Sequence, residues 1–190
     1  MGQYIAQLLS FIAENGEAIR YYAAQIIGIL IIIGVIVIMQ MKKKKQMLII
    51  SVVVNFLSAV NVLLLSGFSS GVVVCCVAVL QLLISIRHEI KKTEVGIAEK
   101  IIFLILYVGG GISGIRGVWD ILTVIAALFY MLAVFQKKEQ NIRLMMLVNH
   151  STWAAYYAII GSTAVLSQVA GLISSLVALF RYRKSKKIAE

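Results

Sequence analysis

The residues best suited to binding a ligand gather on one short stretch of the chain, which carries Asn149, Trp153 and Tyr156. Their spacing of i, i+4 and i+7 places all three side chains on one face of a helix. An asparagine amide donates and accepts hydrogen bonds, and an indole ring offers an apolar stacking surface. Together these groups suit a neutral polar ligand with one apolar face. A second interpretation stays open, in which the amide only hydrogen-bonds a neighbouring helix.

Two ionisable residues inside or beside apolar segments suggest further roles. His150 points about 100° away from Asn149 around a helix, and we favour a structural hydrogen bond for it over a proton relay. Asp120 is the only acidic residue near an apolar segment, and it follows Arg116 by four residues. We expect Asp120 to be the N-cap of the next helix and to pair with Arg116. A gate at the membrane surface is the alternative role for this pair.

Other arrangements that carry chemistry are missing from the sequence. There is no Ser, His and Asp constellation and no pair of carboxylates, and the adjacent Cys75 and Cys76 have no nearby His or acidic residue to complete a metal site. We therefore expect no enzymatic activity, no metal and no cofactor.

The composition is that of a membrane protein. Of the 190 residues, 61% are hydrophobic and 14% are charged, whereas soluble domains have about 45–50% apolar and about 25% charged residues. This argues against a disordered chain and against a soluble enzyme. The net charge of +10 does not indicate nucleic-acid binding, because the basic residues stand in short clusters between apolar segments. The expected partner is the lipid bilayer, and no nucleic acid is expected.

Seven apolar segments approach the length that spans a bilayer. Backbone groups in lipid must be satisfied internally, which favours helices for all of them. Gly110 and Gly114 lie in the fourth segment, where their spacing favours close packing against a neighbouring helix. The segments cover residues 21–41, 47–65, 71–86, 101–113, 119–135, 144–160 and 164–180.

The basic residues predict the orientation. With the N-terminus outside, all 18 Lys and Arg residues except Arg20 and Arg116 face the cytoplasm. We therefore predict a multi-pass protein of the bacterial plasma membrane with its N-terminus outside and its C-terminus inside. Residues 1–20 precede the first span, and their apolar pattern predicts an amphipathic helix on the outer surface that ends at Asn15-Gly16.

An internal repeat relates the two ends of the chain. A single offset aligns Asn55 with Asn149, and three helices per copy require one extra helix to keep the copies parallel. We predict an all-α polytopic fold with three-helix repeats at 21–92 and 118–190, the second including a basic tail, and a loop and linker helix at 93–117. The same offset aligns Lys43-Lys44 with Lys137-Lys138, Gly67 with Gly161, and Arg87 with Arg181.

This 3+1+3 plan resembles that of the SWEET sugar transporters and the PQ-loop superfamily. Within that superfamily, the chain over about residues 21–187 most resembles the YgjV-like bacterial inner-membrane proteins. The resemblance implies a SWEET-like fold more firmly than it implies an activity. The residues that carry it are Trp119-Asp120, Gln136-Lys137-Lys138, Asn149, Trp153, Tyr156, Gly161-Ser162, Ser174 and Arg181.

The chain also departs from its sugar-transporting relatives. It has no proline, whereas PQ-loop proteins carry a Pro-Gln pair, and the repeat mate of Trp153 is Ala59. Those relatives place an asparagine on the last helix of each repeat, where this chain has Gln81, Gln168, Ser174 and Ser175. A sugar is therefore not the expected substrate. The predicted binding residues are Asn149, Trp153, Asn55, Tyr156, Ser174 and Gln81.

Two functions of different classes follow from these features. The first is an uncoupled facilitator that moves a small neutral polar or amphipathic solute by alternating access, since no acidic residue lies near the middle of a predicted span to bind a coupling ion. The second is a non-transporting scaffold or the membrane subunit of a larger complex. A homo-oligomer or a protein partner is compatible with either function.

Overall fold

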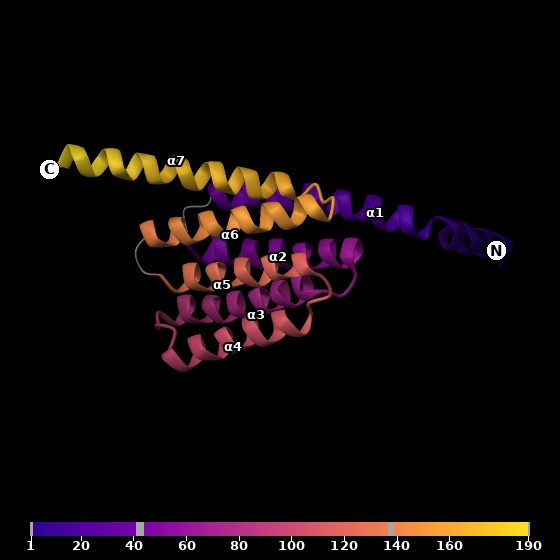
Figure 1. Cartoon of the computed structure of the whole chain (residues 1–190), viewed down its shortest axis with the longest axis horizontal. Helices are drawn as coiled ribbons and strands as arrows, with labels where there is room; N and C mark the ends of the chain where they lie inside the picture. Colours follow the sequence, from indigo (N-terminus) through magenta and orange to yellow (C-terminus); the bar gives the residue numbers. More distant parts are fainter. Residues whose placement is uncertain (1, 41–43, 137–138, 190) are drawn as a thin grey trace.

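The computed structural model describes residues 2–40, 44–136 and 139–189, with side chains described for 15–38, 45–136, 141 and 143–177. Within these residues it has seven α-helices joined by turns, which confirms the predicted all-α class and number of helices (Figure 1). A 3-10 turn, η1, precedes the fifth helix. The elements are α1 (Gly2–Gln40), α2 (Lys44–Ser66), α3 (Ser70–Lys91), α4 (Ile97–Ser113), η1 (Val118–Asp120), α5 (Ile121–Phe135), α6 (Glu139–Ile159) and α7 (Val165–Ala189).

Within the described residues, four helical segments are long and apolar enough to cross a membrane by length and composition. A fifth apolar segment, Val165–Val177, is shorter. The α4 helix has 17 residues, which is near the lower limit for a span. The four long segments are Asn15–Ile38, Lys45–Ser66, Ser70–Lys91 and Val118–Phe135.

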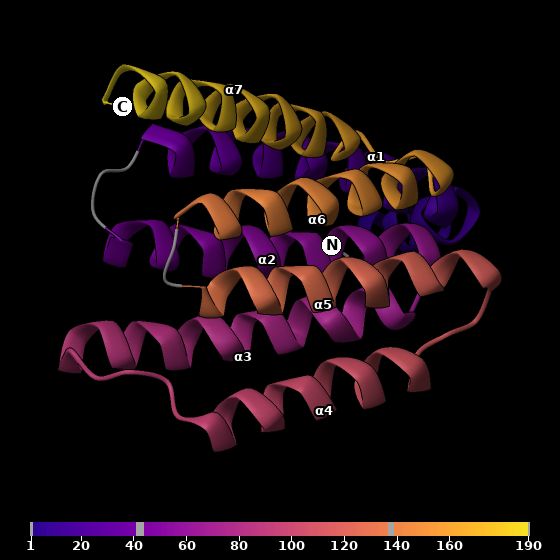
Figure 2. The same cartoon turned by 60° about the vertical axis from the view of Figure 1, so that its left-hand side comes forward.

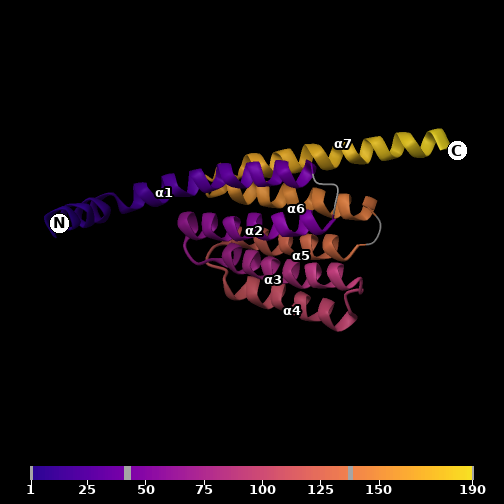
Figure 3. The same ribbon diagram turned by 180° about the vertical axis from the view of Figure 1, so that it is seen from behind.

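The predicted helix end at Asn15-Gly16 is wrong, because α1 continues through both residues. A glycine inside a helix costs only about 1 kcal/mol, and Gly16 does not adopt the left-handed conformation that ends a helix. The α1 helix therefore projects beyond the other helices as one piece (Figure 3). The position of residues 1–20 on the outer surface stays a prediction.

The helices form two rows that face each other. One row is α1, α2 and α3, and the other is α7, α6 and α5 (Figure 2). Contacts between α3 and α5 and between α1 and α7 join the rows into a flattened ring. The α4 helix lies outside this ring, where it packs against both α3 and α5. Each row places its middle helix, α2 or α6, between two neighbours.

Two hydrophobic clusters hold the helices together. One centres on Tyr107 and Met131 and joins α3, α4 and α5. The other centres on Ile31 and Tyr156 and joins α1, α2, α3 and α6. The half-buried Trp153 packs against both clusters, so this side chain connects the two parts of the core.

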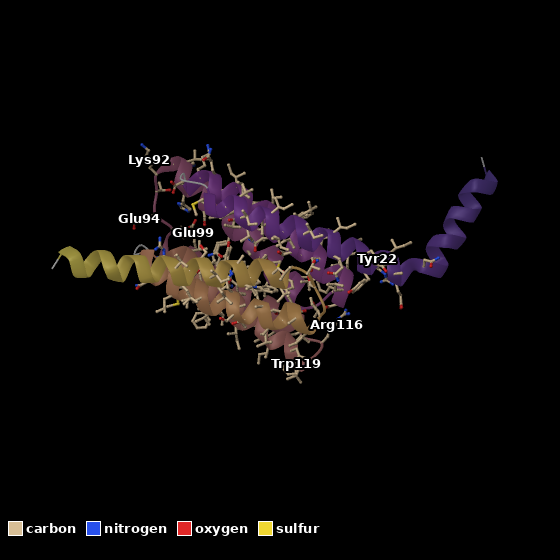
Figure 4. The ribbon with its side chains drawn as sticks, turned by 90° about the horizontal axis from the view of Figure 1, so that it is seen from above. Tyr22, Lys92, Glu94, Glu99, Arg116 and Trp119 are labelled. Carbon is tan, nitrogen blue, oxygen red and sulfur yellow. The ribbon has the colours of Figure 1, made fainter. Side chains whose placement is uncertain are left out.

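The two ends of the bundle differ in character. We call one the turn end, because it holds the short connections 67–69, 114–117 and 160–164. We call the other the basic end, because Lys45, Arg87, Lys91, Lys92, Lys100 and Arg143 lie at the helix ends there. Figure 4 shows Arg116 and Trp119 at the turn end and Lys92, Glu94 and Glu99 at the basic end.

Glycines shape the turn end. Gly67 and Gly161 both have φ of +68°, a left-handed conformation that glycine adopts without steric cost. Gly114 lies so close to the backbone of Ser69 and Ser70 that a Cβ could not fit, and Gly110 lies equally close to Val73. The predicted close packing of the Gly110 and Gly114 face is therefore confirmed, and its partner is α3.

Candidate functional site

A cavity of about 440 Å³ lies between the two rows and receives residues from all seven α-helices. Its volume is within the range of about 300–1,000 Å³ that is typical of small-molecule sites. The polar and aromatic side chains that line it are Ser51, Asn55, Ser58, Tyr107, Tyr130, Arg143, Asn149, His150, Trp153, Tyr157, Gln168, Ser174 and Ser175.

The cavity reaches the basic end of the bundle. Along α2 its lining runs from Ser58 to Met47, and along α6 it runs from Tyr157, in the last turn of that helix, to Arg143 near the start. Met47 is 37% exposed at the basic end. Towards the turn end, the buried Tyr156 and the hydrogen bonds around it close the space.

Asn149 and Asn55 both line the cavity, as the repeat suggests. Asn149 is 4% exposed, and its Nδ2 donates to the Ala126 carbonyl of α5 at 2.8 Å. Asn55 instead donates to the Ser51 carbonyl of its own helix at 2.8 Å. The first bond joins two helices, whereas the second stays within one. Both amides can still accept a hydrogen bond from a ligand through Oδ1.

Aromatic rings form one wall of the cavity. Trp153 stacks on Tyr157, with ring centroids 5.2 Å apart and planes inclined by 27°. It also meets Tyr156 edge to face at 5.8 Å. Stacked and edge-to-face pairs of this kind fix ring orientation. Trp153 and Tyr157 therefore present a rigid apolar surface near the Asn149 amide.

Two of the six predicted binding residues lie outside the cavity lining. Tyr156 is one helical turn nearer the turn end than Trp153, where its hydroxyl donates to Asp120 Oδ1 at 3.2 Å. Gln81 is fully buried behind Tyr107, whose hydroxyl donates to Gln81 Oε1 at 2.7 Å. The other four, Asn149, Trp153, Asn55 and Ser174, come together around one space.

Asp120 occupies the predicted N-cap position of α5 but does not act there as predicted. Its side chain makes no capping bond to α5, and Oδ2 instead accepts from the backbone N–H groups of Arg116 and Gly117 at 2.8 and 3.1 Å. The carboxylate thus satisfies the preceding turn, whose N–H groups have no helical partner. The predicted Arg116–Asp120 ion pair is replaced by this backbone contact, and the Arg116 guanidinium lies beside Gly67.

Hydrogen bonds between the two rows gather at the turn end. Ser162 Oγ donates to Asn61 Oδ1 at 2.7 Å, and Asn61 Nδ2 donates to the Ala24 carbonyl. Ser70 and Thr123 share a bond of 2.7 Å between their hydroxyls. All four of these polar side chains are buried, and so is Ala24, which contributes its backbone carbonyl. The sequence analysis missed Asn61, although a polar residue inside the apolar α2 segment was the available sign.

His150 has the structural bond that we favoured. Its Nδ1 lies 2.7 Å from Gln168 Oε1 on α7. The ring lies against Gly171, where a Cβ would collide with it. His150 and Gln168 both line the cavity, so this pair holds α6 to α7 while it borders the ligand space.

A separate ionic contact lies at the basic end. His88 Nε2 is 3.0 Å from Glu99 Oε1, which joins the end of α3 to the start of α4. The hydrogen bond from His88, with a second from the Gly96 N–H, holds the pKa of Glu99 below its ordinary value. No group of three or more His, Cys, Asp or Glu residues that could hold a metal occurs in the described part of the chain.

Comparison with known proteins gives one match. A family model described as bacterial inner membrane protein matches residues 22–186. No curated protein and no solved structure matches the chain.

Proposed function

Since this chain belongs to the Imp-YgjV family of bacterial inner membrane proteins, we propose that it is an uncoupled facilitator of a small neutral polar or amphipathic solute. The observation that carries this proposal is the cavity of about 440 Å³ between the two rows. It reaches the surface at the basic end and is closed at the turn end. A facilitator that works by alternating access needs a central site that opens at one end at a time.

The proposal includes a SWEET-like organisation of the helices. In this interpretation α1–α3 and α5–α7 are parallel three-helix units, and α4 is the linker. The matched glycines support it, because Gly67 and Gly161 have the same φ of +68° at equivalent turns. The matched asparagines support it too, since Asn55 and Asn149 line one cavity from opposite rows.

The proposed orientation places the basic end in the cytoplasm. This follows the excess of Lys and Arg on cytoplasmic loops of membrane proteins. In a chain with Cys75 and Cys76 replaced by alanine, Phe68→Cys should react with an impermeant thiol reagent in intact cells. Lys45→Cys should not react. Both positions are exposed, and the opposite labelling would overturn the orientation.

The lining selects the class of solute. Amide and hydroxyl groups from Asn149, Gln168 and Ser174 can hydrogen-bond a polar solute, and Trp153 can stack on an apolar face. The described lining includes no Asp or Glu. Proton- and sodium-coupled carriers use intramembrane acidic groups, and a described lining without a carboxylate therefore supports passive movement.

The turn-end hydrogen bonds supply the closed side of the cycle. Opening that side would separate Ser162 from Asn61 and Ser70 from Thr123, while the basic end would close around Met47 and Arg143. Individual interhelical hydrogen bonds in membranes are worth about 0.6 kcal/mol on average. A small set of them can therefore hold one state and still be exchanged during transport.

The test is solute flux in proteoliposomes made from the purified full chain. We expect saturable, gradient-driven flux for at least one member of a panel of neutral polar and amphipathic solutes, such as polyols and aryl alcohols, without dependence on a proton or sodium gradient. Trp153→Ala should weaken solute binding by about 2 kcal/mol, as expected for a buried aromatic anchor.

The matched control is Trp119→Ala, because Trp119 is 60% exposed and far from the cavity. It should leave the flux unchanged. Absence of flux for the whole panel, together with a stoichiometric protein partner after mild solubilisation, would overturn the facilitator and favour the membrane-subunit alternative.

A further inference from the structure

The hydrogen bonds between α1 and the segment that leads into α7 lie at the turn end. Gln25 Nε2 donates to the Gly161 carbonyl at 2.9 Å, and Gln25 Oε1 accepts from the Thr163 N–H at 2.9 Å. Thr163 Oγ1 also donates to the Gln25 carbonyl at 3.0 Å. Gly28 allows this approach, because a Cβ there would collide with the Thr163 side chain. These bonds hold α1 against the start of α7.

Beyond this contact the two helices diverge towards the basic end, as Figure 4 shows. Both nevertheless line the cavity there: α1 contributes Val35 and Ile38, and α7 contributes Gly171, Ser174 and Ser175. The cavity therefore extends into the space between the diverging helices. We call this space the α1–α7 seam.

The opposite seam of the ring is covered. There α3 meets α5, and α4 packs over both. Gly111 of α4 lies against Val74 and Val124, and the buried Tyr107 of α4 reaches the cavity wall. In the described part of the chain, no additional helix covers the α1–α7 seam in this way. The two seams thus differ in their access to the surrounding lipid.

The flanks of the α1–α7 seam are apolar and exposed. Ile33 and Ile36 of α1 are 52% and 48% exposed, and Ile173 and Val177 of α7 are 58% and 51% exposed. In a membrane protein such side chains contact lipid acyl chains. A molecule that crosses the seam therefore passes from hydrocarbon to the amide and hydroxyl groups of the cavity.

We propose that the α1–α7 seam is a lateral portal through which a single-chain amphipath reaches the cavity from the membrane leaflet at the basic end. The apolar chain lies in the seam between Val35 and Ser174, and the polar group lies against Asn149. This proposal rests on the proposed function and narrows its solute class to molecules that partition into the bilayer.

The two tryptophans allow a direct test. Trp119→Phe leaves Trp153 as the sole tryptophan in the full chain. This variant is reconstituted in phosphatidylethanolamine and phosphatidylglycerol vesicles with either ordinary or mid-chain dibrominated acyl chains, which quench indole emission on contact. We expect brominated lipid to quench Trp153 about as strongly as a lipid-facing tryptophan at the same depth. That reference is Ala155→Trp in a chain with both native tryptophans changed to Phe, since Ala155 is exposed on the same helix.

Blocking the seam separates the portal from general lipid contact. Ser174→Phe fills the seam from α7 and should abolish most of the bromolipid quenching of Trp153. The matched control Val169→Phe adds the same ring on the exposed face of α7 and should leave the quenching intact. If Ser174→Phe does not fold, Val35→Phe blocks the same seam from α1.

The outcomes distinguish the portal from the facilitator. Quenching of Trp153 by aqueous acrylamide but not by brominated lipid would overturn the portal and leave the facilitator standing. Protection of Trp153 from both quenchers would overturn the portal together with the open cavity. Bromolipid quenching that Ser174→Phe removes would support the portal. If no water-soluble solute moves in the flux experiment, that result would count against the facilitator but not against the portal.

Discussion

The middle helices of the two rows, α2 and α6, occupy equivalent places but carry different chemistry. Asn55 and Asn149 both line the cavity. One residue further along, Phe56 is 59% exposed, whereas His150 bonds Gln168 inside the bundle. Four residues further along, Ala59 stands where Trp153 forms the aromatic wall. Similar backbones thus support a site whose functional groups come mainly from one side.

This difference shows what each row supplies. The α5–α7 row supplies the aromatic wall, the histidine and Gln168, whereas the polar lining residues of the α1–α3 row are limited to Ser51, Asn55 and Ser58 of α2. A symmetric pair of helices can hold an asymmetric ligand only if the side chains differ. Substitutions that make α2 and α6 more alike, or that change positions where the two rows already agree, therefore test how far the rows differ in function and stability.

The largest effect is expected from Trp153→Ala, which gives α6 the residue of α2. The indole packs against both hydrophobic clusters, so its removal should lower the free energy of unfolding by about 3 kcal/mol. Thermal unfolding in detergent measures this loss. Trp119→Ala should change the melting temperature little, and an equal loss in both variants would contradict the central position of Trp153.

The next largest effect on stability is expected at the two equivalent turn glycines, where the rows have the same backbone conformation. Gly67→Ala and Gly161→Ala each place a side chain at φ of +68°, which should cost about 1 kcal/mol in either case. Steric crowding should not make the two losses differ. A Cβ at Gly161 has no neighbour within 4 Å, and a Cβ at Gly67 would lie 3.5 Å from the Arg116 guanidinium, which is ordinary van der Waals contact. Unequal losses in chemical denaturation would show that the two turns are not equivalent.

A smaller difference in unfolding free energy is expected between alanine variants of the two matched asparagines. Asn149→Ala removes a bond between α6 and α5 and should cost about 0.6 kcal/mol or somewhat more. Asn55→Ala removes a bond within α2 and should cost less. Denaturation of both variants under the same conditions measures the difference. A larger loss for Asn55→Ala would reverse the assignment of the interhelical role.

The smallest effect concerns the basic end, where α3 and α4 are joined by His88 and Glu99. Because the folded-state pKa of Glu99 is lowered, its contribution to stability is present above the ordinary carboxyl pKa and is lost as the pH falls through the lowered value. Glu99→Gln should therefore melt slightly below wild type at neutral pH, and the gap should vanish in acid. The exposed Glu17→Gln should show no gap at either pH, and a gap that widens in acid would refute the linkage.

The helices and the cavity could be anticipated from local patterns. Apolar segment length gave seven helices, and the i, i+4 spacing of Asn149 and Trp153 placed both on the inner face of α6. The same spacing did not distinguish Tyr156 from Tyr157. Tyr156 is predicted on the cavity face, but its hydroxyl bonds Asp120, and the neighbouring Tyr157 lines the cavity instead.

The other predictions failed at residues whose side-chain partners come from tertiary contacts that local sequence patterns do not show. Asp120 bonds backwards to Arg116 and Gly117 because those N–H groups lack partners, which a one-dimensional capping rule does not detect. Gln81 depends on Tyr107, which comes from a different helix. Asn15-Gly16 is a common helix terminator, yet α1 continues through it because no left-handed residue follows.

The placement of α4 also fixes how the ring can move. By packing against α3 and α5 together, with Gly114 against the Ser69–Ser70 backbone, it ties one edge of the two rows to each other. In the proposed transport cycle, rigid-body rotation of the rows would have its hinge at that edge. The α1 and α7 helices are the members of the ring farthest from this edge. A small rotation about α4 would therefore change the distance between α1 and α7 more than it changes any other distance between the rows.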